Sequence, residues 1–144
     1  MPLFTFTNPN LRQDGPTVIF GLGVPSVVAQ AMSNSGQAVP PDIQITGLID
    51  TGASQTAIAT GLAAQLGLTP VGIVPVTTPS HASVQLPVYY ARLSFYQPNG
   101  WLDIPVIEMA QQGPSIQCLV GRDVLALGIL VYVGPSNTYT LSLG

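Results

Sequence analysis

The residues with the clearest potential for chemistry form the triplet Asp50-Thr51-Gly52, which follows the apolar pair Leu48-Ile49 and precedes the small Ala53. Residues 42–49 alternate in side-chain character until the triplet breaks the pattern, so the carboxylate is expected where a strand ends. Two carboxylates that share one proton can take a proton from water and return one. The triplet is also ordinary turn chemistry, because Asp bonds to nearby backbone amides and Gly tolerates positive φ. Taken alone, the triplet is therefore equally consistent with a simple turn and with half of an acid–base site.

A second motif near the C-terminus joins an apolar pair, a glycine and a stretch of helix-forming residues. It reads Cys118-Leu119-Val120-Gly121-Arg122-Asp123-Val124-Leu125. In order and separation, the two motifs resemble those of the retropepsin-like aspartic proteases. Residues 77–83 lie between the motifs, at the place where that family carries its flap, and they form a polar stretch containing a proline. The resemblance runs roughly from Thr17 to the C-terminus.

The resemblance implies a role for each residue of the first motif. Asp50 is expected to be the catalytic residue, with Thr51 and Gly52 supporting the active-site loop and the Thr51 hydroxyls interlocking across a dimer. Gly52 lacks a side chain, which lets a substrate backbone approach closely. The residues expected to bind substrate are Gly52, Ala53, Ser54, Ser80, His81, Ala82 and Ser83. Apolar subsites for substrate side chains are expected to be lined by Ile49, Val74, Val76, Leu86 and Ile116. For His81, the sole histidine, a solvated side chain is the simpler alternative.

The second motif is expected to act structurally, through Gly121, Arg122 and Asp123. For Arg122 we expect an ion pair, with Asp123 or Asp14 as the partner, rather than a catalytic role. The chain departs from the resembled family at two places. Retroviral relatives often carry an acidic residue just after the triplet, where this chain has Ser54, and their flaps are rich in glycine, which residues 80–83 lack.

One Asp-Thr-Gly triplet in 144 residues supplies half of a two-carboxylate site, so symmetry must supply the other half. The sequence therefore predicts a homodimeric aspartic endopeptidase that cleaves an extended peptide, with an acidic activity optimum and without a cofactor or metal ion. The alternative is a retropepsin-fold dimerisation or peptide-binding module with weak or no catalysis. A β-rich capsid or scaffold subunit fits the low charge but leaves the two motifs unexplained.

The elements that must position these residues are mostly strands. The 14 prolines and 15 glycines punctuate short Val, Ile, Leu and Tyr runs, which predicts a mainly β fold. We expect one retropepsin-like acid protease domain over residues 1–144, with a closed barrel-like core, a flap hairpin and one or two short helices. The expected strands include residues 17–29, 42–49, 71–76, 84–93, 101–109, 116–120, 130–133 and 138–143. The expected helices are residues 60–66 and 122–127, and residues 2–6 are expected to pair with 138–143 between protomers.

Composition narrows the possible partners and compartments. Charged residues make up 6% of the chain, there is no lysine, and three arginines form no basic patch, so nucleic acid is not an expected partner. So little surface charge favours burial of apolar surface in an oligomer. Cys118 is the single cysteine, and residues 1–10 lack the pattern of a signal peptide. We expect no membrane segment, and a reducing cytoplasm is the most compatible compartment.

Overall fold

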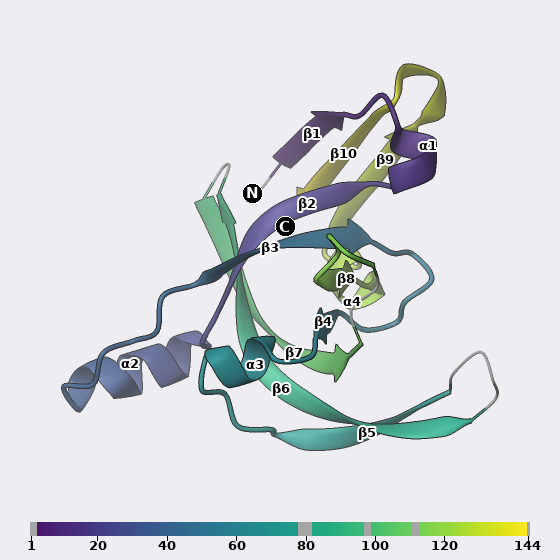
Figure 1. Ribbon diagram of the computed structural model, residues 1–144. Helices are drawn as coiled ribbons and strands as arrows, with labels where there is room; N and C mark the ends of the chain where they lie inside the picture. Colours follow the sequence, from purple (N-terminus) through teal and green to yellow (C-terminus); the bar gives the residue numbers. More distant parts are fainter. Residues whose placement is uncertain (1–2, 78–81, 97–98, 111–112, 144) are drawn as a thin grey trace.

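The larger sheet closes into a barrel. The computed structural model describes residues 3–77, 82–96, 99–110 and 113–143, and in these ranges the larger sheet has the strand order β2-β3-β8-β4-β7-β6-β5. Because β2 also pairs with β6, six of its strands form a closed ring, which confirms the expected mainly β, barrel-like fold (Figure 1). The strands are β2 (Thr17–Gly23), β3 (Ile43–Ile49), β4 (Ala57–Ala59), β5 (Gly72–Thr77), β6 (Ser83–Tyr96), β7 (Asn99–Met109) and β8 (Cys118–Val120).

A smaller sheet joins the two ends of the chain. Its order is β1-β10-β9, with β1 at Leu3–Thr7, β9 at Gly128–Val133 and β10 at Thr138–Leu143. The expectation that the terminal strands pair between protomers is wrong for these two segments, because β1 pairs with β10 of the same chain, in antiparallel register. Asn8 N–H donates to the Asn137 carbonyl at 2.9 Å, which ties the ends of both strands together. With β1 and β9 on either side, β10 has no free edge.

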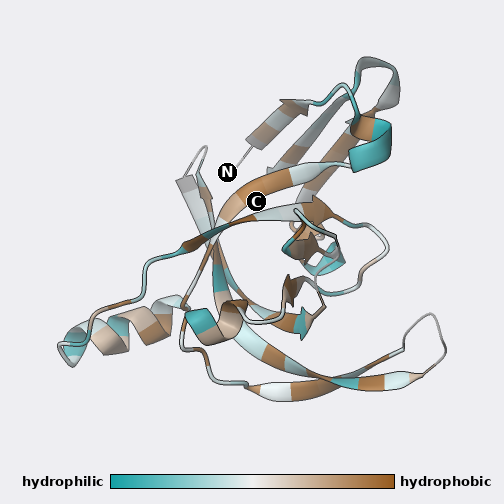
Figure 2. Ribbon diagram, viewed as in Figure 1, coloured by the Kyte–Doolittle hydropathy of each residue, from teal (hydrophilic) through white to brown (hydrophobic). Residues whose placement is uncertain are grey.

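The two sheets share one apolar core. Phe4 of β1 lies 5.5 Å from Phe95 of β6, and Phe95 lies 5.8 Å from Phe20 of β2, as measured between ring centroids. Tyr139 of β10 donates its hydroxyl hydrogen to the Thr17 carbonyl at 2.7 Å and accepts the Thr17 N–H at 3.1 Å. Apolar residues recur along the barrel strands in Figure 2, as expected for strands with one buried face. The small sheet is therefore fixed to the barrel by packing and by hydrogen bonds.

The helices are short, and two of them were expected. They are α1 (Leu11–Asp14), α2 (Ser26–Asn34), α3 (Leu62–Gln65), α4 (Arg122–Leu125) and a single 3₁₀ turn, η1 (Gly134–Ser136). The predictions for residues 60–66 and 122–127 are confirmed by α3 and α4. None of the described helices is long and apolar enough to cross a membrane.

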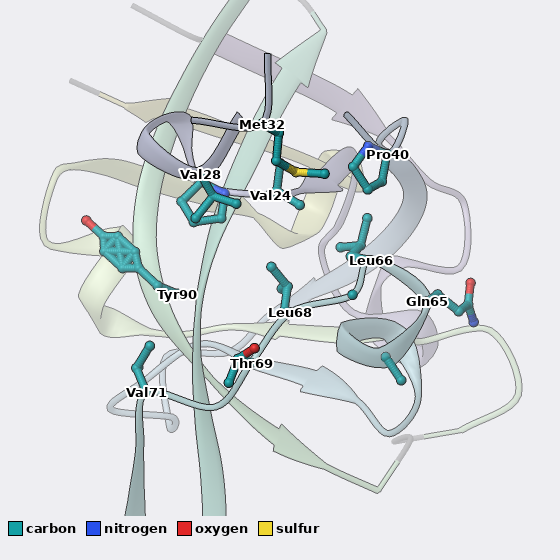
Figure 3. Close-up of a pocket in the computed structure, with 13 residues that line it drawn as sticks. Val24, Val28, Met32, Pro40, Gln65, Leu66, Leu68, Thr69, Val71 and Tyr90 are labelled. Atoms are coloured by element: carbon teal, nitrogen blue, oxygen red, sulfur yellow. The ribbon is translucent and has the colours of Figure 1, made fainter. Parts of the chain in front are cut away.

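The strand expected over residues 17–29 ends at Gly23, because α2 begins at Ser26. Proline fixes φ near the helical value, so Pro25 suits the start of a helix. Val28 and Met32 are four residues apart, which places them on one side of α2, and Val24 lies just before the helix. They line a hollow of about 530 Å³ beside Leu66 and other apolar residues (Figure 3). Helix α2 buries none of its residues, so the proline at its start, rather than burial in the core, is the local feature that favours a helix here over the strand that the Val-rich sequence suggests.

Candidate active site

Asp50 lies directly after β3, where the chain leaves the barrel (Figure 1). Its backbone N–H donates to the Val120 carbonyl at 2.9 Å, and its own carbonyl accepts the Ala53 N–H at 3.2 Å, which closes a tight turn. The Gly52 N–H donates to Asp50 Oδ1 at 2.9 Å. This bond fixes the orientation of the carboxylate. Asp50 is half-buried, so its carboxylate is both held by the loop and within reach of a ligand.

The second motif lies beside the first because β8 runs parallel to β3. Ile49 and Val120 are register partners, so Asp50 and Gly121 follow neighbouring strands at the same end. A Cβ atom at Gly121 would lie 2.6 Å from the carbonyl carbon of Gln55. Only glycine permits this approach of one backbone to the other. Close packing between the motifs therefore gives a physical reason for the glycine in the second one.

A buried network around Thr56 joins the loop after the triplet to α4. Asp123 Oδ1 accepts the Thr56 hydroxyl at 2.7 Å, and Asp123 Oδ2 accepts the Thr56 N–H at 3.0 Å. The Thr56 oxygen in turn accepts the Gly121 N–H at 3.1 Å. Thr56 is fully buried, so each of these groups depends on a protein partner. The network holds residues 50–56 against the start of α4.

The Thr56 network supplies a stability test. Replacing Thr56 by Val keeps the shape but leaves the Gly121 N–H and one bond to the Asp123 carboxylate unmade, so the free energy of unfolding should fall by about 2–3 kcal/mol. The matched control is Thr60→Val, since Thr60 is exposed and makes a longer bond of 3.4 Å to the Met109 carbonyl. It should cost less than about 0.5 kcal/mol. Urea unfolding measures both values, and equal losses would contradict a structural role for the network.

Arg122 binds the active-site loop in a different way from the one expected. Its Nη1 donates to the Thr51 carbonyl at 2.7 Å, and its backbone N–H donates to the Ala53 carbonyl at 2.8 Å. The expected ion pair with Asp123 or Asp14 is not what the contacts show. The Asp123 carboxylate is directed at Thr56 and the N–H of Val124, and Asp14 accepts a bond from Asn8. Arg122 therefore stabilises the triplet loop by donating hydrogen bonds to two of its backbone carbonyls.

A hollow of about 490 Å³ opens between the triplet and the β5–β6 hairpin. Asp50, Gly52, Ala53 and Ser54 lie on its wall. Its other lining residues are Gln55, Ala57, Val74, Pro75, Val76, Thr77, Leu86, Ile107, Met109 and Leu119. The hollow thus combines one carboxylate with a wall of mixed polarity, in which apolar side chains outnumber polar ones, and this suits the side chains and backbone of an extended peptide.

The hollow brings together only some of the residues expected to bind substrate. Of the expected apolar subsites, Val74, Val76 and Leu86 line it, whereas Ile49 is buried in the core and Ile116 is not among the lining residues. Ser80 and His81 lie outside the described residues. Ala82 directly precedes β6 and Ser83 is its first residue, where it pairs with Thr77; neither is among the residues that line the hollow. Ile107, Met109 and Leu119 were missed, because their alternation along β7 and β8 predicts strands without showing which face meets the site.

Other candidate reactive groups that the structure describes do not form a second site. Cys118 is buried, and burial, followed by the nearby Asp123 charge, raises the pKa of its thiol, so it is no nucleophile at neutral pH. In the described part of the chain, no three His, Cys, Asp or Glu side chains cluster as metal ligands would. Trp101 is exposed on β7, 5.6 Å from the Arg92 guanidinium that lies over its ring, and it does not line the hollow.

Comparison with known proteins finds a family match for the central part of the chain. The model of a family described as aspartyl protease matches residues 36–124, which is more than half of the chain. The match includes the triplet, the β5–β6 hairpin and the Gly121 motif, and it leaves β1, β9 and β10 outside. No curated protein matches the chain.

Proposed function

The chain belongs to the aspartyl protease family, with a retropepsin-like fold, and from this premise we propose that it is an endopeptidase that acts as a homodimer. The observation that carries the proposal is the placement of the Asp50 carboxylate. It is held by the Gly52 N–H at the wall of an apolar hollow, beneath a β hairpin. This arrangement suits a reaction in which a peptide lies across a carboxylate.

The second carboxylate comes from a second copy of the chain. Acid–base hydrolysis of an amide needs one group that takes a proton from water and another that donates one to the substrate. Two carboxylates about 3 Å apart do both, because they share one proton. Since each chain has one Asp-Thr-Gly triplet, Asp50 faces the Asp50 of its partner across a two-fold axis.

Hydrolysis then follows from the singly protonated pair. The ionised carboxylate takes a proton from a water held between the two residues, and the water oxygen bonds to the scissile carbonyl carbon. The protonated carboxyl gives its proton to the carbonyl oxygen, which forms a neutral tetrahedral intermediate. The carboxyl that took the water proton then passes it to the amide nitrogen, and the C–N bond breaks. A hydroxyl group of the intermediate gives its proton to the other carboxylate as the new acid forms, which restores the singly protonated pair. Gly52 supports these steps by holding Asp50 Oδ1.

The substrate class follows from the walls of the hollow. An extended peptide that runs between the triplet loop and β5 would present side chains to Val74, Val76 and Leu86, with Ile107 and Met109 further along the wall. Among the described residues that line the hollow, Asp50 alone carries a charge. The site therefore favours apolar side chains around the cleaved bond, held by backbone bonds of the kind that extended peptides make with a strand.

A peptide-binding module would share this fold and this hollow, so the proposal is tested by the affinity for the tetrahedral intermediate. A peptide whose scissile bond is replaced by a statine-type hydroxyl unit should bind at least about 10²-fold more tightly than the matching peptide. Isothermal titration against Asp50→Asn provides the control, because that variant should lose the preference and keep the affinity for the plain peptide. Equal affinity of the wild type for both ligands would identify a binding module.

A further inference from the structure

Strand β9 has a free edge that lacks the usual protection against pairing. It pairs with β10 on one side, and its other edge pairs with no strand in the part of the chain that the structure describes. Exposed sheet edges commonly carry charges, prolines or bulges that block association. The sequence of β9 is Gly-Ile-Leu-Val-Tyr-Val, and no charged residue follows Asp123 in the chain. This edge therefore accepts another strand without electrostatic cost.

The side chains of β9 are also unusually exposed for their type. Ile129 is 67% exposed, and Val131 and Tyr132 are each close to half exposed. These residues point to both faces of the strand, since neighbours alternate. By contrast, Phe4, Tyr139 and Leu141 on the inner face of the same sheet are buried. The described residues thus leave the apolar surface at this edge uncovered.

The free edge lies beside the half-site. Leu130 of β9 and Thr51 of the triplet line one small hollow of about 360 Å³, together with Arg122, Leu125 and Ala126. Arg122, the first residue of α4, lines this hollow beside Leu130 and donates to the Thr51 carbonyl, so it lies between β9 and the triplet. In Figure 1, α4 lies close to β9. A second chain that docks on β9 therefore approaches Thr51 and Asp50 as well.

We propose that β9 pairs antiparallel with β9 of a second copy, across a two-fold axis, to form one continuous sheet in the order β1-β10-β9-β9-β10-β1. The inference rests on the proposed function only for the need to bring two Asp50 residues together. Antiparallel pairing of a strand with itself is the self-complementary contact that two-fold symmetry requires. It satisfies the open backbone groups of β9 and covers Ile129, Val131 and Tyr132. The opposite edge, β1, lies at the other side of the sheet, and none of its residues 4–7 lines the Thr51 hollow.

Charges placed on β9 should separate the copies. In the variant with Ile129→Lys and Val131→Lys, four added charges meet across the axis, so sedimentation velocity should show a dissociation constant raised at least about 100-fold. The matched control is Thr5→Lys with Thr7→Lys on β1, the opposite edge of the same sheet, where Thr5 and Val131 are both register partners of Thr140. This control should remain as dimeric as the wild type. Circular dichroism establishes that both variants are folded.

A cross-linking measurement keeps the test valid if the lysine variant unfolds. Val131→Cys and Ile129→Cys, oxidised mildly at low concentration, should give disulfide-linked dimers at one or both positions, because disulfides form only between backbones a few ångströms apart. The native Cys118 is buried, and Thr5→Cys is the matched control that should stay monomeric on denaturing gels. A wild type that is monomeric at all concentrations, or a folded lysine variant that stays dimeric, overturns the inference. If β9 holds the dimer and the wild type cleaves no peptide, the interface stands and the proposed function fails.

Discussion

Replacing Asp50 by Asn should reduce peptide cleavage by about 10³-fold or more while leaving the fold intact. Asn keeps the size of the side chain, and its carbonyl oxygen can still accept the Gly52 N–H that now donates to Asp50 Oδ1 at 2.9 Å. It cannot take a proton from water, so the chemical step fails in every dimer that contains it. The measurement is kcat/KM on an apolar peptide, at equal concentrations of folded protein.

The matched control for this variant is Asp14→Asn. Asp14 is an exposed carboxylate whose contact is a bond from Asn8, far along the chain from the triplet. Its replacement should change kcat/KM by less than about twofold. Thermal unfolding of both variants should resemble that of the wild type. Undiminished cleavage by Asp50→Asn would assign the activity to other residues.

The local sequence was sufficient to predict the strands and helices that hold the site. The alternation in residues 42–49 places Asp50 after a strand, and the good helix formers in residues 60–66 give α3. The hairpin β5–β6 was also predicted, since a polar stretch separates two Val-rich runs. The family resemblance depends on the same local motifs, and the family match over residues 36–124 agrees with it.

Contacts between distant segments were harder to predict. The pattern of residues 138–143 indicates a strand, but a pattern does not name its partner, and β10 pairs with β1 and β9 of its own chain. Removal of residues 138–144 would therefore take away the central strand of the small sheet, with the buried Tyr139 and Leu141, rather than only a dimer contact. The first residues of α2 were predicted as part of a strand because Val27 and Val28 favour strands locally, whereas the helix begins after Pro25 and buries none of its residues.

The contacts of the second motif illustrate a further limit. A charged side chain suggests a charged partner, yet Arg122 donates to the carbonyls of Thr51 and Ala53, and Asp123 accepts from Thr56. Backbone carbonyls and N–H groups occur at every residue, so their directions become known only from the fold. These contacts explain how Gly121-Arg122-Asp123 holds the triplet loop in place.

The central claim, that two chains share one active site, is tested most directly by mixing wild type with a ninefold excess of Asp50→Asn protomers. Random exchange leaves about one tenth of the wild-type chains paired with each other, so activity per wild-type chain should fall about tenfold. Substrate is kept in large excess over total protein, so that the inactive chains do not deplete it, and the same excess of an unrelated protein is the control. Activity that stays constant per wild-type chain after full exchange would show that one chain cleaves alone, and would contradict the shared site.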